Sequence, residues 1–180
     1  MKRSSAVWCG IVTIGCLLLL SFAAARGDDY DPLAVSLKFT PQILDLTVKD
    51  RQRHRDIPVR VYLPKAKHAA PLILFSPGLG GSREGNSYLG KHWAARGYLA
   101  VFLQHPGSDT DVWKNEAPRR RMQALRKAAN AHNFLLRVQD VPAVLDQLDL
   151  WNKTEGHALA GRLNLRKVGM SGHSFGAMTA

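Results

Sequence analysis

The sequence predicts an α/β fold in which a mixed, mostly parallel sheet carries helices on both faces. Two unbroken apolar runs, at 72–75 and 98–103, are typical of parallel strands that are covered on both sides. Helix-sized segments separate these runs from each other and from a short third strand expected at 167–171. Right-handed crossovers between such alternating elements build a parallel sheet.

A β-hairpin is expected before the parallel strands. Apolar and polar residues alternate over 44–48 and again over 57–63, which is the period of half-buried strands. The polar stretch 50–55 joins the two as a turn. An antiparallel hairpin that leads into parallel strands makes the expected sheet a mixed one.

Two helices are expected between and after the parallel strands. Residues 86–96 carry apolar side chains four apart and are followed by a glycine suited to a left-handed C-cap. Residues 133–151 repeat apolar side chains at intervals of three and four, and Pro142 is expected to kink this helix or to mark a late start. Arg137 and Asp140, three residues apart, are expected to form a structural ion pair.

The amino terminus has the pattern of a secretory signal peptide. Lys2 and Arg3 precede an apolar run over 6–25 that ends in three alanines, the small residues that a signal peptidase requires. We expect cleavage after Ala25 and a secreted or periplasmic protein. The alternatives are an uncleaved signal anchor, since about 20 apolar residues span a bilayer, and a lipoprotein acylated at Cys16.

The expected organisation is a signal peptide over 1–25, an extended N-terminal arm over 26–42 and an α/β domain over 43–180. Cys9 and Cys16 are the only cysteines, and both lie in the apolar N-terminal run. The folded part therefore has no disulfide framework, no thiolate metal site and no cysteine nucleophile.

The chain is basic, with 25 Lys and Arg against 14 Asp and Glu and a formal net charge of +11. Such a charge is compatible with a nucleic acid, an anionic membrane or an acidic polymer as partner. Pro118 can open a helix through the basic segment, and no aromatic residues interleave with its charges to stack bases. We therefore expect a solvated surface and no nucleic-acid partner, with contact to a membrane or anionic surface as the alternative. The basic residues are Lys114, Arg119, Arg120, Arg121, Arg126 and Lys127.

The segment 172–176 fits the nucleophile motif G-x-S-x-G, with a strand leading in and a first helical turn leading out. Ser174 is the expected nucleophile, held in a strained turn. Gly172 and Gly176 are expected to let the strand and helix backbones approach closely. His173 is expected to point away from the serine hydroxyl and to pack.

Acyl transfer through a serine also needs N–H donors for the oxyanion. The backbone N–H of Phe175, directly after the nucleophile, is one candidate. The other is the N–H of Leu79, in the loop that follows the 72–75 strand. The alternative for this loop is a plain glycine-rich turn, because it has no phosphate-binding pattern.

Three segments carry a resemblance to a known family: FSPGLGGSREGNSYLGKHWAARGYLAVFLQHPGSD, NFLLRVQDVPAVLDQL and VGMSGHSFGAMTA. Over roughly 55–180 the chain resembles the predicted dienelactone hydrolases and the platelet-activating-factor acetylhydrolase-like branch of the α/β-hydrolases. The resemblance implies an α/β-hydrolase fold, Ser174 as nucleophile, and Leu79 and Phe175 as oxyanion donors.

The acid and the base of a catalytic triad are expected after the nucleophile in this fold. Only FGAMTA follows Ser174, so we expect the chain to be the N-terminal portion of the hydrolase domain, with the C-terminal part missing and both partners beyond residue 180. His105, at the end of a predicted strand, is the rival base, with Asp109 or Asp111 beside it.

The sequence thus indicates an exported serine hydrolase that cleaves small-molecule carboxylic esters, of the kind used in lipid degradation, through an acyl-enzyme on Ser174. No cofactor or metal is expected, and the oligomeric state is left open. The alternatives are an amidase or peptidase of the same fold, and a non-catalytic secreted binding protein that keeps the nucleophile turn as scaffold.

The signal-peptide interpretation predicts that the exported product begins at Arg26, because Ala23-Ala24-Ala25 forms the cleavage site. N-terminal sequencing of protein recovered outside the cytoplasm checks this. An intact Met1 on membrane-bound protein would support the signal anchor instead.

Overall fold

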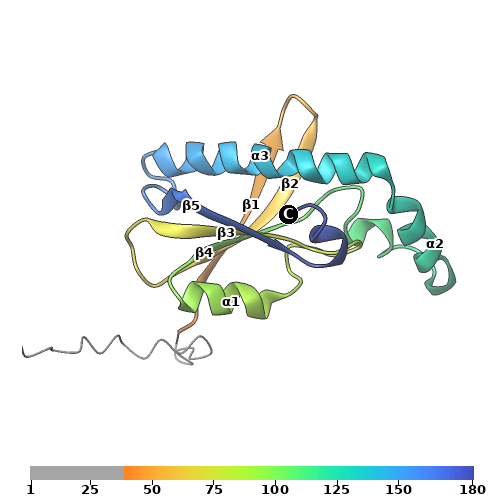
Figure 1. Cartoon of the computed structure of the whole chain (residues 1–180), viewed down its shortest axis with the longest axis horizontal. Coiled ribbons are helices and arrows are strands. Elements are labelled where there is room, and N and C mark those ends of the chain that lie inside the picture. The colour runs from red at the N-terminus through yellow and green to blue at the C-terminus, as the bar shows by residue number, and fades with distance from the viewer. Residues whose placement is uncertain (1–38) are drawn as a thin grey trace, which may run out of the picture. The chain divides into compact units, whose positions relative to one another are not determined.

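The computed structural model describes residues 39–180, which form a sheet with helices packed against it (Figure 1). The expected signal peptide and most of the expected arm lie outside the described residues. The strands are β1 (Gln42–Asp50), β2 (Arg55–Leu63), β3 (Ala70–Ser76), β4 (Leu99–Leu103) and β5 (Leu163–Gly172). The helices are α1 (Ser87–Ala95), α2 (Pro118–Ala128) and α3 (Ala131–Lys153), with short 3-10 helices η1 (Thr110–Val112) and η2 (Ser174–Gly176).

The described strands form one sheet in the order β1-β2-β4-β3-β5. Strands β1 and β2 form the expected hairpin, and β2 is also antiparallel to β4. Strand β3 is parallel to both β4 and β5. The predicted mixed, mostly parallel sheet with a leading hairpin is confirmed in outline, with two parallel and two antiparallel pairings among these strands.

Strand β5 is longer than predicted. It begins at Leu163 rather than Lys167, because Leu163 and Asn164 pair with the start of β3 before a register shift. Arg166 and Lys167 interrupt the apolar pattern there, and both are exposed.

Helices cover both faces of the sheet, as predicted (Figure 1). On one face Val144 and Leu148 of α3 pack into a core formed by the aliphatic residues of the strands. On the other face α1 packs against an aromatic cluster that includes Tyr62, Phe75 and Phe102. Burial of these two apolar layers holds the sheet at the centre of the domain.

Helix α3 runs without interruption from Ala131 to Lys153. The Asn130 side chain caps its start by accepting a hydrogen bond from the backbone N–H of Asn133 at 2.8 Å. Pro142 lies inside the helix. The expectation that Pro142 marks a late helix start is therefore wrong.

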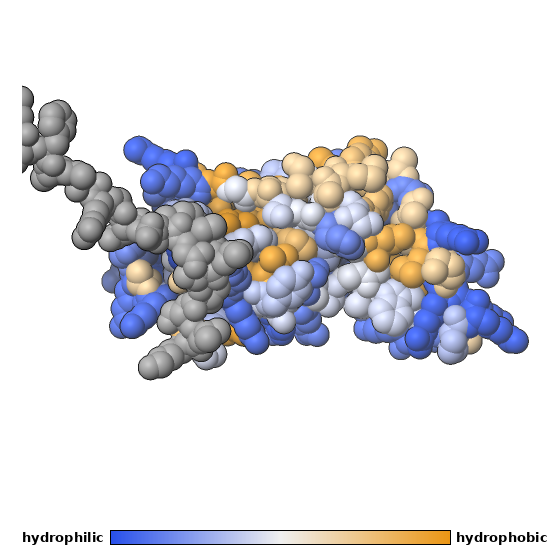
Figure 2. Space-filling model, turned by 60° about the horizontal axis from the view of Figure 1, so that its bottom comes forward, coloured by the Kyte–Doolittle hydropathy of each residue, from blue (hydrophilic) through white to orange (hydrophobic). Residues whose placement is uncertain are grey.

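Helix α2 begins at Pro118, as predicted, and its basic side chains other than Arg121 are exposed. The end of the molecule where α2 lies in Figure 1 is strongly hydrophilic in the space-filling view (Figure 2). Within residues 39–180, no helix is both long enough and apolar enough to cross a membrane.

Helix α1 lies close to strand β2 at Gly90. A Cβ atom at this position would lie 2.5 Å from ring carbons of Tyr62, which is fully buried. Glycine therefore sets the distance between the helix and the sheet.

Gly90→Ala in the full-length protein should lower the free energy of unfolding by about 1–3 kcal/mol, because the added methyl overpacks the Tyr62 contact. A helix alone would gain stability from this change, so a loss isolates the packing effect. The control is Gly169→Ala on β5, where a Cβ would meet only the Leu72 carbonyl oxygen at 4.0 Å. Urea unfolding curves measure both, and equal midpoints would contradict the packing argument.

Candidate active site

Ser174 stands in a tight turn directly after strand β5. Its φ angle is 52°, in the left-handed region that non-glycine residues rarely adopt. The backbone turns at once into η2, where the N–H of Gly176 donates to the carbonyl of His173 at 2.8 Å. Holding a serine in this conformation costs about 1–3 kcal/mol. The predicted strand is present, and a single 3-10 turn stands where a helical turn was expected.

The two glycines of the motif are fixed by contact with backbone atoms. A Cβ on Gly172 would overlap the carbonyl group of Gly176, and a Cβ on Gly176 would overlap the carbonyl oxygen of Ser76 at the end of β3. The His173 N–H also donates to that Ser76 carbonyl at 3.2 Å. The turn at Ser174 is therefore pressed against the end of the neighbouring strand.

The loop that carries Leu79 follows β3 and is held from the side. The Gly80 N–H donates to the Ser108 carbonyl at 2.8 Å, and the Trp113 indole N–H donates to the Gly80 carbonyl at 2.8 Å. Among residues 39–180, no acceptor takes a hydrogen bond from the N–H of Leu79 or of Phe175. Both candidate donors are thus free to bind another group.

The Leu79 loop and the turn at Ser174 share one hollow of about 350 Å³. Ser174 and His173 line it together with the residues of the loop. His173 is exposed, so the packing role expected for it is not observed. The structure thus brings Ser174 and the Leu79 loop to one cavity.

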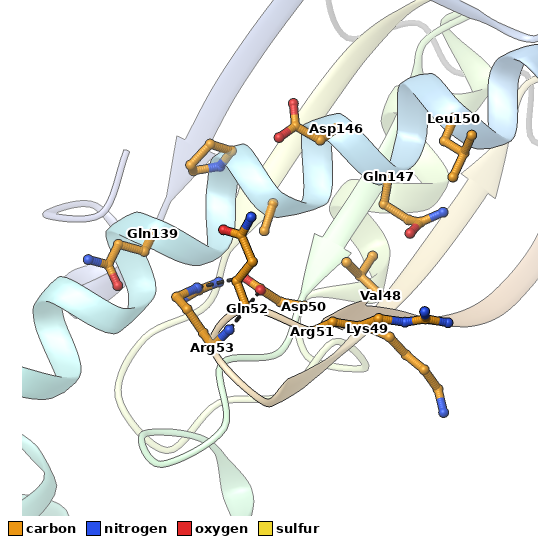
Figure 3. Close-up of a pocket in the computed structure, with 12 residues that line it drawn as sticks. Val48, Lys49, Asp50, Arg51, Gln52, Arg53, Gln139, Asp146, Gln147 and Leu150 are labelled. Carbon is orange, nitrogen blue, oxygen red and sulfur yellow. Dashed lines mark hydrogen bonds and ion pairs between the residues drawn. The ribbon is translucent and has the colours of Figure 1, made fainter.

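A second hollow, of about 470 Å³, lies between the turn of the β1–β2 hairpin and helix α3 (Figure 3). Arg53 and Asp50 in its wall are paired with each other at 2.6 Å. Its lining contains no serine, cysteine or histidine. The hollow beside Ser174 is therefore the better candidate for chemistry, although it is the smaller of the two.

His105 lies in a buried chain of hydrogen bonds and does not serve Ser174. Its Nδ1 lies 2.9 Å from a carboxylate oxygen of Asp140, and its Nε2 lies 3.0 Å from the Ser76 hydroxyl. All three residues are fully buried. Both ring nitrogens are occupied, so the structure does not support His105 as the rival base.

The two aspartates expected beside His105, Asp109 and Asp111, bind other residues. Asp109 accepts a hydrogen bond from the Gln104 amide at 2.7 Å, and Asp111 pairs with Lys114 at 2.6 Å. Within residues 39–180, no histidine or carboxylate hydrogen-bonds the Ser174 hydroxyl, and no cluster of side chains could hold a metal ion.

The expected ion pair between Arg137 and Asp140 is wrong. Asp140 instead binds Arg53 and Arg55, each at 2.9 Å, besides His105. Arg137 instead donates to the hydroxyl of Thr179, five residues after Ser174, at 3.1 Å. Both side chains lie on the buried face of α3, so partners from the sheet and its loops outcompete the neighbour on the same helix.

The sequence contained one overlooked signal for this network. A charged pair on a helix face that is otherwise apolar must be buried, and buried charges need several partners. His105, at the end of an apolar strand, is the kind of residue that supplies a hydrogen-bond partner to a buried charge.

Burial lowers the pKa of His105, and the charges of Arg137 and Arg55 lower it further, against the opposing effect of Asp140. The imidazole is therefore neutral, with the proton on Nδ1 assigned from its carboxylate partner. Burial alone would raise the pKa of Asp140, but hydrogen bonds from His105 and Arg55 hold it below its usual value. Asp140 is therefore ionised.

This network predicts acid-sensitive folding. Because the pKa of His105 is lower in the folded state than its ordinary 6.5, the unfolded chain takes up the proton first, and stability falls as the pH drops below about 6.5. In His105→Gln the free energy of unfolding should depend less on pH between about pH 7.5 and about pH 5. Urea titrations at both pH values test this, with exposed His132→Gln as control. Equal pH dependence in wild type and His105→Gln would contradict the assignment.

Solved structures resemble this chain in fold. No protein-family model matches the sequence, and no curated protein matches it. A ferulic acid esterase from Streptomyces cinnamoneus has a similar structure, with a TM-score of 0.53 and 19% identity over 83% of this chain and 56% of the esterase. A protein assigned as a dienelactone hydrolase from Klebsiella pneumoniae subsp. pneumoniae MGH 78578 gives 0.51 and 17% over 77% of this chain and 52% of its own.

An acylaminoacyl peptidase from Pyrococcus horikoshii gives a TM-score of 0.50 and 18% identity over 78% of this chain and 21% of the peptidase. The chain spans about half the length of the esterase and of the dienelactone hydrolase. At these identities the likeness concerns the fold, and it confirms the fold that the resemblance implies. Together with the mixed sheet and its two helical layers, it shows that the chain has the α/β-hydrolase fold.

Proposed function

We propose that this protein is a serine hydrolase that cleaves small-molecule carboxylic esters through an acyl-enzyme on Ser174. The observation that carries the proposal is the left-handed turn at Ser174, which faces the same hollow as the Leu79 loop. Left-handed backbone at a non-glycine residue persists only where surrounding structure holds it, and such residues cluster at active sites.

In the proposed reaction the Ser174 hydroxyl oxygen attacks the ester carbonyl carbon while a base removes its proton. The N–H groups of Leu79 and Phe175 donate to the oxyanion of the tetrahedral intermediate. Collapse breaks the bond to the alcohol, which leaves with the proton, and water then hydrolyses the acyl-enzyme by the same route. A positive helix end adds little here, because η2 is only a single turn.

The base in this proposal is a histidine beyond residue 180, because this fold places the histidine after the nucleophile in the sequence. The buried hydrogen bonds of His105 support this choice, because a histidine that serves Ser76 and Asp140 has no ring nitrogen left for a second serine. Export through a cleaved signal peptide is part of the same proposal.

Amide hydrolysis is the second candidate, because the fold is shared with the Pyrococcus horikoshii peptidase. An ester and an amide of the same acyl group distinguish the two activities. A higher kcat/KM for the amide would replace the esterase proposal by a peptidase or amidase.

Ser174→Ala in the full-length protein should lower ester hydrolysis by at least about 10³-fold, because the covalent route disappears while the oxyanion donors remain. Fluorophosphonate labelling should disappear with it. The control is Ser171→Ala, on strand β5 three residues before Ser174, which should keep both activity and labelling.

Equal labelling of the wild type and Ser174→Ala would show that another serine reacts. No turnover and no labelling in the wild type would favour the non-catalytic binding protein that keeps this turn as scaffold.

A further inference from the structure

We propose that Arg137 is a positioning residue that fixes both oxyanion donors, Leu79 and Phe175, relative to Ser174. The inference rests on the proposed function. It assigns a role to a buried side chain on α3 that the reaction described above does not use.

Arg137 joins segments that are far apart in the sequence. Its side chain is only 1% exposed, and its guanidinium lies 4.9 Å from the centre of the Phe175 ring. Its hydrogen bonds reach the end of β3, the loop after β4 and the residues after the nucleophile. The acceptors are the Ser76 hydroxyl at 3.0 Å, the Pro77 carbonyl, the Ser108 hydroxyl at 3.0 Å and the Thr179 hydroxyl at 3.1 Å.

The first donor segment is held from two sides through Arg137. Its Nη2 binds the carbonyl of Pro77, two residues before Leu79. Its Nη1 binds the side chain of Ser108, and the main-chain carbonyl of Ser108 accepts the N–H of Gly80, directly after Leu79. The Leu79 peptide therefore lies between two points that Arg137 fixes.

The second donor segment is held through a short relay. The Nε of Arg137 donates to the hydroxyl of Thr179, and that hydroxyl donates to the carbonyl of Phe175 at 3.1 Å. The guanidinium also lies over the Phe175 ring. One planar cation thus sets the direction of the residue whose N–H is the other donor.

The nature of these partners argues against a simple structural ion pair. Within residues 39–180 no carboxylate bonds Arg137, since Asp140 is taken by Arg53, Arg55 and His105. Burial lowers the pKa of Arg137 to about 10, so it stays protonated at neutral pH. A buried cation without a bonded anion is costly. In the proposed reaction the same positive charge stabilises the oxyanion, so the unfavourable burial of Arg137 favours catalysis.

Lysine cannot replace this arrangement, because one ammonium group cannot reach four acceptors in the plane of a guanidinium. Displacement of a catalytic group by about 1 Å can cost about 10²-fold in rate. We therefore expect Arg137→Lys to weaken stabilisation of the oxyanion and to leave substrate binding nearly unchanged.

The test compares Arg137→Lys and Arg137→Met with Arg162→Lys in the full-length protein. Arg162 also binds main-chain carbonyls, those of Pro64 and Ala66, but at the other end of β3. Hydrolysis of a p-nitrophenyl ester should show kcat lowered by about 10–100-fold in Arg137→Lys and further in Arg137→Met. KM should change by less than about threefold.

Inhibition by a trifluoromethyl ketone, whose adduct with the serine carries an oxyanion, gives a readout that a purely structural role would not move. Its affinity should fall in parallel with kcat/KM in the Arg137 variants and stay at the wild-type level in Arg162→Lys. A folded Arg137→Lys protein with the kcat and inhibitor affinity of Arg162→Lys would overturn the inference.

If the Arg137 variants do not fold, Thr179→Val tests the relay with Arg137 in place. The control is Thr154→Val, whose hydroxyl binds the Leu150 carbonyl at the end of α3. We expect a lower kcat in Thr179→Val and the wild-type kcat in Thr154→Val. Equal kcat in the two variants would overturn the inference. A wild type without Ser174-dependent turnover would instead refute the proposed function.

Discussion

The parallel pairing of β3 with β5 ends with Ser76 opposite Gly172, and the candidate site depends on that register. Parallel neighbours finish at the same edge of a sheet, so the loop that leaves β3 and the turn that leaves β5 meet there. Contact between Gly176 and the Ser76 carbonyl then leaves no room for a side chain. A shift of one residue would turn Ser174 to the other face of the sheet.

Beneath this edge lies a layer of buried polar groups that is satisfied almost entirely by its own members. Asp140 binds two arginines and a neutral histidine, and the arginines compensate its charge. Arg137 therefore hydrogen-bonds only neutral acceptors. Asp140 and its two arginines lie on the hairpin side of this layer, and Arg137, to which no carboxylate bonds among residues 39–180, lies on the side of Ser174. Such a network specifies one arrangement of the loops, because a partly satisfied alternative would strand a charge.

The sequence was sufficient for the elements whose signals are local. Apolar runs located β3 and β4, alternation located the hairpin, and the spacing of glycines around Ser174 located the turn. The partners within the buried network could not be predicted, because its bonds join residues far apart in the sequence, such as Ser76 with His105, 29 positions apart, and Arg55 with Asp140, 85 positions apart. Local geometry suggested Arg137 with Asp140 instead, and tertiary partners prevailed.

The hydrogen-bonded chain of Ser76, His105 and Asp140 has the connectivity of a catalytic triad, with spacings of 3.0 and 2.9 Å. Ser76 is nonetheless sealed from solvent, and its hydroxyl accepts from Arg137 while it donates to the histidine. Within residues 39–180, a search for three side chains at triad distances would select this serine and not Ser174. Distance templates therefore need a test of solvent access before they assign a nucleophile in this fold.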